Sequence, residues 1–287
     1  MDKLRFAVSD HHLAYAVYLT GKDKDFPGLL DLRNSLRVEF GDFSGYAIFT
    51  LEPESSIFDF TQSTSKTISA TTILRDADTI ISIFDRIFVS PFFCEARLDA
   101  TKYMNDLREN WNSNEAQIFE TLSLLTSFSM PAQADVYVLD PKLNTASYIH
   151  DNKIEIGLND HSIRVSSVIL AHELMHYWIA KSGRTFNDPE LWVIHALIFI
   201  NTNERLQAHL DRTESLATEN SQSEIDPRIC ALVPIVRRFW DRWRLHHTPD
   251  IIAFILDEQV RKRPQTIVRF SNAGNHEIEM TGYCPVP

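Results

Sequence analysis

The stretch SSVILAHELMHYWIAKSG, Ser166–Gly183, sets two histidines and one glutamate inside an otherwise apolar run. The pattern predicts a helix that follows an N-cap at Asn159, Asp160 or Ser162 and ends at Lys181, before a glycine suited to a helix C-terminus. Burying two imidazoles and a carboxylate without partners costs free energy. These side chains therefore need a partner that a plain core helix does not supply.

The three polar side chains of this helix have the HExxH spacing. His172 and His176 are four residues apart, so their imidazoles project from one helix face and can bind one cation. Glu173 is displaced by about 100° and can reach a water on that cation. Zinc at such a site lowers the pKa of the water and polarises a carbonyl, while the glutamate moves the proton to the leaving amine. The plain alternative is a helix with two partly exposed histidines.

A second predicted helix follows and contains a single histidine. It begins at residues 188–190, DPE, with a cap, a proline at the first helical position and an acid in the first turn. It continues to Asn201, and His195 is the only polar residue between Glu190 and Asn201. By itself, His195 is either a further metal ligand or a satisfied core histidine.

Together the two helices resemble the gluzincin metallopeptidases, the thermolysin and aminopeptidase N group. Aminopeptidase N-like enzymes carry HExxH, 18 residues and then a glutamate ligand on a second helix; here 18 residues separate His176 from His195. HELMHYW is similar to their HELAHQW, and NDPELW before His195 is similar to their NDLWLNE. The resemblance covers about 25 of the 287 residues and places His195 where the family has its glutamate ligand.

The resemblance implies a zinc-dependent metallopeptidase that hydrolyses peptide or protein substrates. Its site would hold one Zn²⁺ per chain through His172, His176 and His195, with Glu173 as general base and acid. The implied fold is α+β, a zincin-like core with a mixed sheet, an edge strand, the HExxH helix and a second ligand-bearing helix. Imidazole in place of a carboxylate ligand leaves one more unit of positive charge on the centre, which should make the bound water more acidic.

Two glutamates compete with His195 for the third ligand position. Glu190 lies five residues earlier on the same predicted helix, and Glu204 lies just past its end. Five residues correspond to about 500° of helical rotation, so only one of Glu190 and His195 can face the other histidines.

Other family features depart from the pattern. The carboxylate that gluzincins often place one turn after the third ligand would fall at Phe199, and a GAMEN-like segment is missing. We therefore expect an endopeptidase or a narrow-specificity peptidase rather than an aminopeptidase. NKIEIGLN, residues 152–159, occupies the place of the zincin edge strand that pairs with substrate, with a core strand as the alternative. Candidate transition-state donors are Tyr177, His246, His247 and Tyr283.

Two other functions are compatible with the same residues. Three neutral ligands with open positions can also hold Fe²⁺, as in an iron-dependent peptide-modifying oxygenase that carries HExxH. A catalytically inactive zincin-like binding module would keep the site without turnover.

The chain is predicted to divide into an N-terminal α+β region at residues 1–130, the zincin-like catalytic core at 131–215 and a mainly helical region at 216–287. Periodicity predicts helices at residues 75–89 and from Ser113 or Asn114 to Phe128. Strands are predicted at 134–140 and 152–159, and a loop at 214–226. His11 and His12 are expected to face solvent.

The composition limits the classes of partner and the cellular environment that we expect for this chain. The net charge of −11, from 28 basic and 39 acidic residues, argues against a general nucleic-acid or anionic-membrane binder. Neither a signal peptide nor an apolar run long enough to span a membrane is visible. Cys94, Cys230 and Cys284 are odd in number and far apart, which favours a reducing, cytoplasmic environment. No feature indicates the oligomeric state.

The segment at residues 235–247, IVRRFWDRWRLHH, interleaves arginine with tryptophan. Such a pattern can bind nucleic acid. In an acidic chain it favours an amphipathic helix whose Trp240 and Trp243 pack inward.

Overall fold

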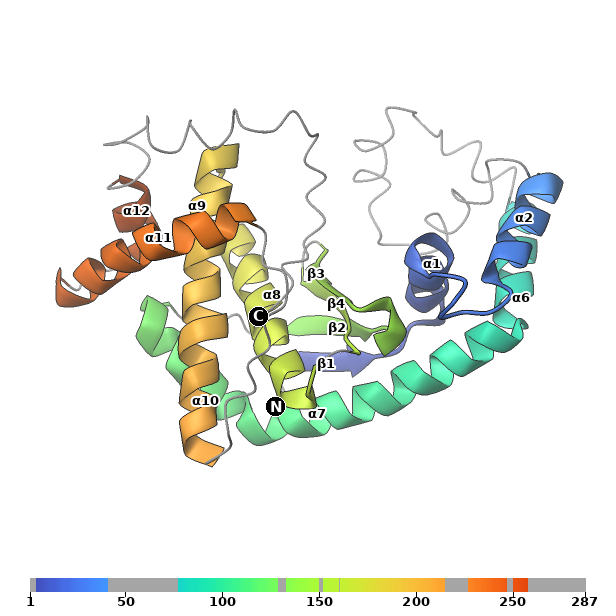
Figure 1. Ribbon diagram of the computed structural model, residues 1–287, viewed down its shortest axis with the longest axis horizontal. Coiled ribbons are helices and arrows are strands. Elements are labelled where there is room, and N and C mark those ends of the chain that lie inside the picture. The colour runs from blue at the N-terminus through green and yellow to red at the C-terminus, as the bar shows by residue number, and fades with distance from the viewer. Residues whose placement is uncertain are drawn as a thin grey trace.

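The structure, a computed structural model, describes residues 4–40, 77–128, 133–149, 152–159, 161–214, 227–246 and 250–257. Within these ranges the protein is a mixed α+β structure, in which helices surround one four-stranded sheet (Figure 1). This confirms the predicted α+β class. Among the described helices, none has the length and apolar character needed to cross a membrane.

The sheet has the strand order β1-β2-β4-β3. Its first three strands run parallel, and the last is antiparallel to its neighbour: β1 (Leu4–Ala7), β2 (Ala134–Val138), β4 (Lys153–Gly157) and β3 (Thr145–Tyr148). The predicted strands at 134–140 and 152–159 are confirmed as β2 and β4. Strand β3 was not predicted. It follows a short 3₁₀ helix, η1 (Pro141–Leu143).

Strand β4 pairs with β2 on one side and with β3 on the other. The expectation that residues 152–159 form the edge strand is therefore wrong, and the alternative of a core strand is confirmed. Ile154 and Ile156 are fully buried. A single four-residue strand, β3, takes the edge position because it folds back antiparallel beside β4 after η1.

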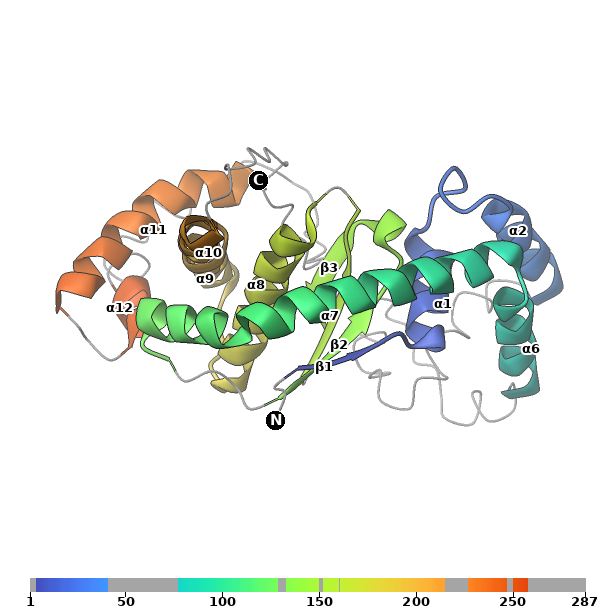
Figure 2. The same ribbon diagram turned by 90° about the horizontal axis from the view of Figure 1, so that it is seen from below.

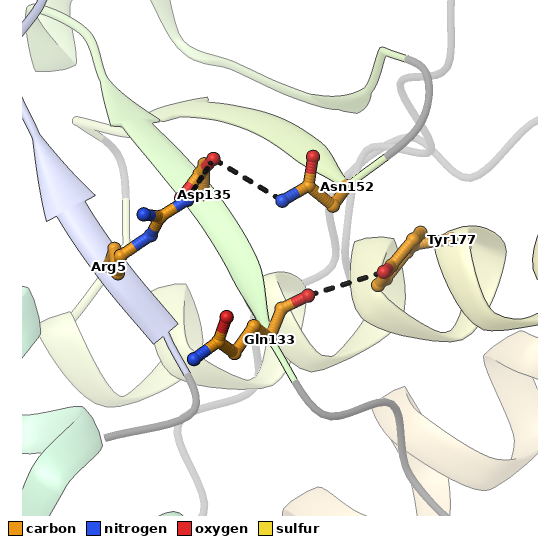
Figure 3. Close-up of polar contacts among 5 residues, drawn as sticks. All are labelled: Arg5, Gln133, Asp135, Asn152 and Tyr177. Carbon is orange, nitrogen blue, oxygen red and sulfur yellow. Dashed lines mark hydrogen bonds and ion pairs between the residues drawn. The ribbon is translucent and has the colours of Figure 1, made fainter. Parts of the chain in front are cut away.

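The two faces of the sheet differ in chemistry because successive side chains alternate between them. Phe6, Val136 and Ile154 lie side by side across the parallel strands. Val136 and Ile154 belong to the main core, on which α7 and α8 pack, and the half-buried Phe6 packs against it. The other face carries polar side chains. There Arg5 donates two hydrogen bonds to Asp135, at 2.6 and 2.8 Å (Figure 3).

The N-terminal helices pack around a second, smaller core. They are α1 (Asp10–Thr20), α2 (Leu29–Phe40) and α6 (Ala77–Phe88). Helix α6 confirms the helix predicted at residues 75–89, and its Phe84 and Ile87 are buried. His12 on α1 is also buried, so the expectation that it faces solvent is wrong.

Helix α7 (Pro91–Thr126) is one continuous helix of 36 residues, which crosses the sheet (Figure 2). The predicted helix start at Ser113 or Asn114 is wrong. Instead of capping a helix N-terminus, the Ser113 hydroxyl donates to the Glu109 carbonyl and the Asn114 amide donates to the Asn110 carbonyl. Both side chains bond to the carbonyl four residues earlier in the same helix. Trp111 and Ile118, on either side of them, are buried, and this packing keeps the helix continuous.

Helix α8 (Ile163–Lys181) carries the HExxH residues and lies against β3 and β4. Its N-cap is Ser162, one of the three predicted caps, and Gly183 at its end adopts a φ of 68°. Positive φ favours glycine, so the predicted stop is confirmed.

Helix α9 (Asp188–Phe199) has its N-cap at Asn187, one residue before the predicted start. The chain then continues without a break through a π-helix, η2 (Ile200–Leu206), into α10 (Gln207–Glu214). Residues 215–226, most of the predicted loop, lie outside the described residues.

Helix α11 (Pro227–His246) packs across α9, and α12 (Ile251–Leu256) follows it (Figure 1). Trp240 and Trp243 on α11 are 0% and 2% exposed, which confirms that they pack inward. The division into three regions stays a prediction. Strand β1, from the predicted N-terminal region, pairs with β2 in the same sheet.

Candidate metal centre

Three histidines from two helices meet at one point. The Nε2 atoms of His172 and His176, on α8, are 3.2 Å apart, and Nε2 of His195, on α9, lies 3.1 Å from that of His172. Zn–N distances of about 2.0–2.1 Å in a tetrahedral site place ligand nitrogens about 3.3–3.4 Å apart. Because the two observed separations are close to this value, both pairs of imidazoles have the spacing expected of zinc ligands.

This group is the one set of three or more potential metal-ligating side chains found among the described residues. His172 is buried, whereas His176 and His195 are half-buried. A cation held by the three nitrogens would therefore be enclosed on the His172 side. On the side of the other two imidazoles it would remain accessible to water or to a ligand.

The orientation of His172 is set by residues of η2. The Nδ1 atom of His172 lies 2.9 Å from Oδ1 of Asn203 and 3.3 Å from Oγ1 of Thr202. An amide oxygen can only accept, so His172 donates its Nδ1–H and keeps the Nε2 lone pair for a cation. Such a contact behind a ligating imidazole selects the tautomer and fixes the ring.

The π-helical geometry of η2 explains how Asn203 reaches His172. Asn203 comes eight residues after His195, and in a regular α-helix its side chain would point roughly 80° away from the direction of His195. The wider i→i+5 turns of a π-helix rotate less per residue, which reduces this offset. At Phe199, where the resembling family often has a carboxylate, the side chain is buried and apolar. An amide one turn later contacts the histidine instead.

Burial keeps the α8 imidazoles neutral. It lowers the pKa of His172 to about 3, helped by the neighbouring His195, although the contact with Asn203 opposes the shift. Burial also lowers the pKa of His176 well below its usual value, again with contributions from the other two histidines. Neutral imidazole is the form that binds a metal, so His172 and His176 are in the required state at neutral pH.

Glu173 lies beside this group and contacts the edge of the sheet. Its carboxylate is 2% exposed and accepts a 2.8 Å hydrogen bond from the backbone N–H of Tyr148 on β3. Burial raises the pKa of Glu173 to about 8, and the Tyr148 N–H opposes this shift. A cation bound nearby would lower the pKa of Glu173 again, because opposite charge favours the carboxylate.

The contact with Tyr148 places the Glu173 carboxylate at the open side of β3. Ile149 N donates to Lys153 O, which makes those two residues a hydrogen-bonded pair in the antiparallel ladder. Such pairs alternate, so Tyr148, opposite Ile154, points its backbone groups away from β4. By the same alternation, Ala146 points its N–H and C=O to the open edge.

Both glutamates that compete with His195 have other contacts. The Glu190 carboxylate accepts a 3.0 Å hydrogen bond from the Asn187 N–H in the capping box of α9. Glu204 forms an ion pair with Arg237 on α11. Neither belongs to the group of converging side chains, whereas His195 does.

Tyr177, one of the four candidate transition-state donors, has its hydroxyl bonded to the chain beside the sheet. Its hydroxyl donates to the Gln133 carbonyl just before β2, at 3.2 Å (Figure 3). Its side chain is 1% exposed, and it therefore has a structural contact with the sheet. The side chain of His246 and all of His247 and Tyr283 lie outside the described residues.

The sequence interpretation missed Thr202, Asn203 and the Tyr148 backbone. A weak indication of the first two was present: three polar residues, NTN at 201–203, interrupt the apolar run about two turns after His195. No side-chain pattern indicates the backbone of Tyr148, because its contribution depends on where β3 lies.

No family model, curated protein or solved structure matches this chain in sequence or in fold.

Proposed function

We propose that this protein is a zinc-dependent metallopeptidase with a zincin-like core, in which His172, His176 and His195 hold the metal and Glu173 is the general base. The observation that supports this proposal is the convergence of three imidazoles, with Nε2 of His172 lying 3.1 and 3.2 Å from those of His195 and His176, beside a buried carboxylate. When bound there, zinc would lower the pKa of a water molecule and polarise the carbonyl of a peptide bond.

The role of Glu173 follows from its position. It follows His172 directly on α8, and its Oε2 atom is held by the Tyr148 N–H at 2.8 Å. Oε1 is therefore the atom assigned to accept a proton from the attacking water and to return it to the amide nitrogen that leaves. The bond to Tyr148 fixes the carboxylate in one rotamer, so it is oriented before substrate binds.

The open edge of β3 fits an extended peptide. Ala146 and Tyr148 direct backbone groups away from β4, and Glu173 lies at this edge. A peptide that added to β3 as a further strand would pair with the backbone of Ala146 and with the Tyr148 carbonyl, because the Tyr148 N–H already donates to Glu173. It would bring one of its own carbonyls toward the histidines. The proposed substrate is therefore a peptide or protein segment in extended conformation.

The first test is metal analysis of protein purified without added metal. We expect about one zinc per chain in the wild type and a large loss of zinc in His195→Ala. The matched controls are Glu190→Gln and Glu204→Gln, which should keep the metal. Tight 1:1 zinc binding by the His195→Ala variant would show that His195 is not a metal ligand. Bound iron together with oxygen-dependent activity would favour the peptide-modifying oxygenase.

The second test uses Glu173→Gln with an unbiased peptide library, read by mass spectrometry. The variant should retain zinc and hydrolyse peptides about 10²–10⁴-fold more slowly than wild type, the range for removal of a general acid–base group. Wild-type activity in Glu173→Gln would exclude the mechanism. A zinc-loaded wild type that cleaves no library peptide would identify a binding module instead.

A further inference from the structure

A second pocket, separate from the metal centre, lies where four helices meet. It has a volume of about 490 Å³ and is lined by residues of α7, η2, α10 and α11. Figure 2 shows these helices gathered at the C-terminal end of α7. Asn203 points to His172, while the next residue, Glu204, lines the pocket and pairs with Arg237. The pocket and the metal centre therefore lie on different sides of η2.

Three arginines, Arg205, Arg237 and Arg244, line this pocket, in a chain whose net charge is −11. Two of them have acidic neighbours: Arg237 pairs with Glu204, and Arg205 lies 4.0 Å from Asp241. For Arg244, the described residues include no carboxylate partner, and its guanidinium lies over the ring of Trp240. Guanidinium groups repel one another when gathered in a concave pocket, so the arrangement favours a bound anion.

Two of the guanidinium groups lie over the ring of one buried tryptophan. The Cζ atoms of Arg205 and Arg244 lie 5.0 and 5.1 Å from the ring centroid of Trp240. Trp240 is fully buried, and its indole N–H donates to Asn201 on η2 at 3.0 Å. Stacking leaves the N–H donors of a guanidinium at its rim, and a stacked arginine loses less conformational freedom on binding.

We propose that this pocket binds a small organic phosphate, with Arg244 and Arg205 as the groups that hold the phosphate. The planar arginine fork matches phosphate oxygens with two parallel hydrogen bonds. The volume is within the roughly 300–1,000 Å³ typical of small-molecule sites, which is larger than a phosphate ion alone requires. Thr121 and Leu125 of α7 supply a hydroxyl and an apolar surface for the rest of the ligand.

Calorimetric titration of the full-length protein tests the proposal at constant ionic strength, with inorganic phosphate, glycerol 3-phosphate and succinate as probes. We expect saturable 1:1 binding of both phosphates, tighter for the ester. Equal affinity for the two phosphates would show that the phosphate group alone is recognised, which still supports the site. Succinate that binds more tightly than either would overturn the assignment of phosphate, as would the absence of saturable binding by both phosphates.

The variants locate the site. Arg244→Gln should weaken binding of both phosphates at least about tenfold, because it removes charged hydrogen bonds. Arg244→Lys, which keeps the charge and loses the fork, should fall between Arg244→Gln and wild type. The matched control is Arg238→Gln, an exposed arginine on α11 outside the pocket, which changes the net charge equally.

Circular dichroism and thermal unfolding establish that each variant is folded. Equal weakening by Arg238→Gln and Arg244→Gln would show only general attraction to positive charge and would overturn the proposal. Binding that Arg244→Gln leaves unchanged would belong elsewhere, including the metal centre, and would overturn it too.

Discussion

Two buried histidine sites lie in the described part of the chain, and their neighbours differ. His12, on α1, contacts Glu155 of β4 through Nδ1 at 2.6 Å and stacks on Tyr137 with ring centroids 4.1 Å apart. At the other site, His172 directs Nε2 toward the Nε2 atoms of His176 and His195. In the first site a carboxylate supplies the partner of the imidazole. In the second site, the imidazole nitrogens face one another.

This contrast shows how a structural histidine differs from a candidate ligand. An imidazole beside a carboxylate has, at one ring nitrogen, a hydrogen-bond partner of opposite character. Imidazoles whose ring nitrogens face one another at about 3 Å offer several lone pairs to one point, which is the arrangement a divalent cation stabilises. Burial alone does not distinguish the two sites, because His12 and His172 are 6% and 2% exposed.

Removal of zinc should have the largest effect and should separate the two sites. A ligand that binds only the folded state stabilises it, by about 4 kcal/mol at a thousandfold excess over Kd. We expect zinc to raise the free energy of unfolding of wild type and of His12→Phe by similar amounts, measured by urea unfolding with and without a chelator. His176→Ala should lose this dependence on zinc. An equal response in all three proteins would place the metal elsewhere.

Loss of the Asn203 contact should have the next largest effect. Asn203 fixes the tautomer of His172, and removal of such a contact typically lowers metal affinity 10–100-fold, so we expect a change of about that size in Asn203→Ala. Competition with a zinc indicator measures it. Asn105→Ala, which changes an exposed amide on α7, is the control and should leave the affinity unchanged. Wild-type affinity in Asn203→Ala would show that η2 does not support the metal centre.

The His12–Glu155 site should respond to mutation in stability alone. Phe in place of His12 keeps a ring against Tyr137 but removes the hydrogen bond to Glu155. The loss of one such contact to a half-buried charged group costs about 1–3 kcal/mol. Urea unfolding of His12→Phe should show this loss, while the zinc content stays at the wild-type value. A loss of zinc in His12→Phe would mean that the two sites are coupled through the sheet.

Asp140 is another buried ionisable side chain. Its side chain is fully buried, Oδ1 accepts from the Lys142 N–H, and Oδ2 has no partner among the described residues. Burial raises the pKa of Asp140 to about 6, although the Lys142 N–H and charge oppose the shift.

The raised pKa of Asp140 predicts a pH dependence of stability. The folded state binds this proton more tightly than the unfolded chain, so the stabilising contribution of protonated Asp140 is complete below about pH 4 and is lost as the pH rises to about 6. Asp140→Asn can still accept from Lys142 N–H and should remove this dependence, on the order of 1–2 kcal/mol. Unfolding followed from pH 4 to 7 measures it. Parallel pH profiles for wild type and Asp140→Asn would contradict the assignment.

Local patterns in the sequence were sufficient to predict helix ends that depend on the backbone preferences of single residues. Gly183 and Pro189 mark the end of one helix and the start of the next, as expected from their backbone preferences. Local patterns failed at Ser113 and Asn114. Both residues favour N-caps, but side chains on either side of them are buried along a single continuous helix.

The residues of the candidate site also fall into two groups, those that local spacing places and those that the tertiary structure places. His172, Glu173 and His176 share one helix, so their spacing alone places the two imidazoles on a common face with the carboxylate next to them. The position of His195 came from a resemblance in spacing. The structure brings its nitrogen to 3.1 Å from that of His172, and it directs both competing glutamates to other partners.

The sequence by itself determined the helix that carries HExxH, the start of the helix that follows it and the positions of the strands at 134–138 and 153–157, because local periodicity and backbone preferences indicate these elements. Only the tertiary structure decided that β3 forms the edge of the sheet, that η2 turns Asn203 toward His172 and that α11 brings Arg237 and Arg244 to the second pocket. Those arrangements join residues far apart in the chain. Their geometry depends on how whole helices and strands pack, which no local periodicity specifies.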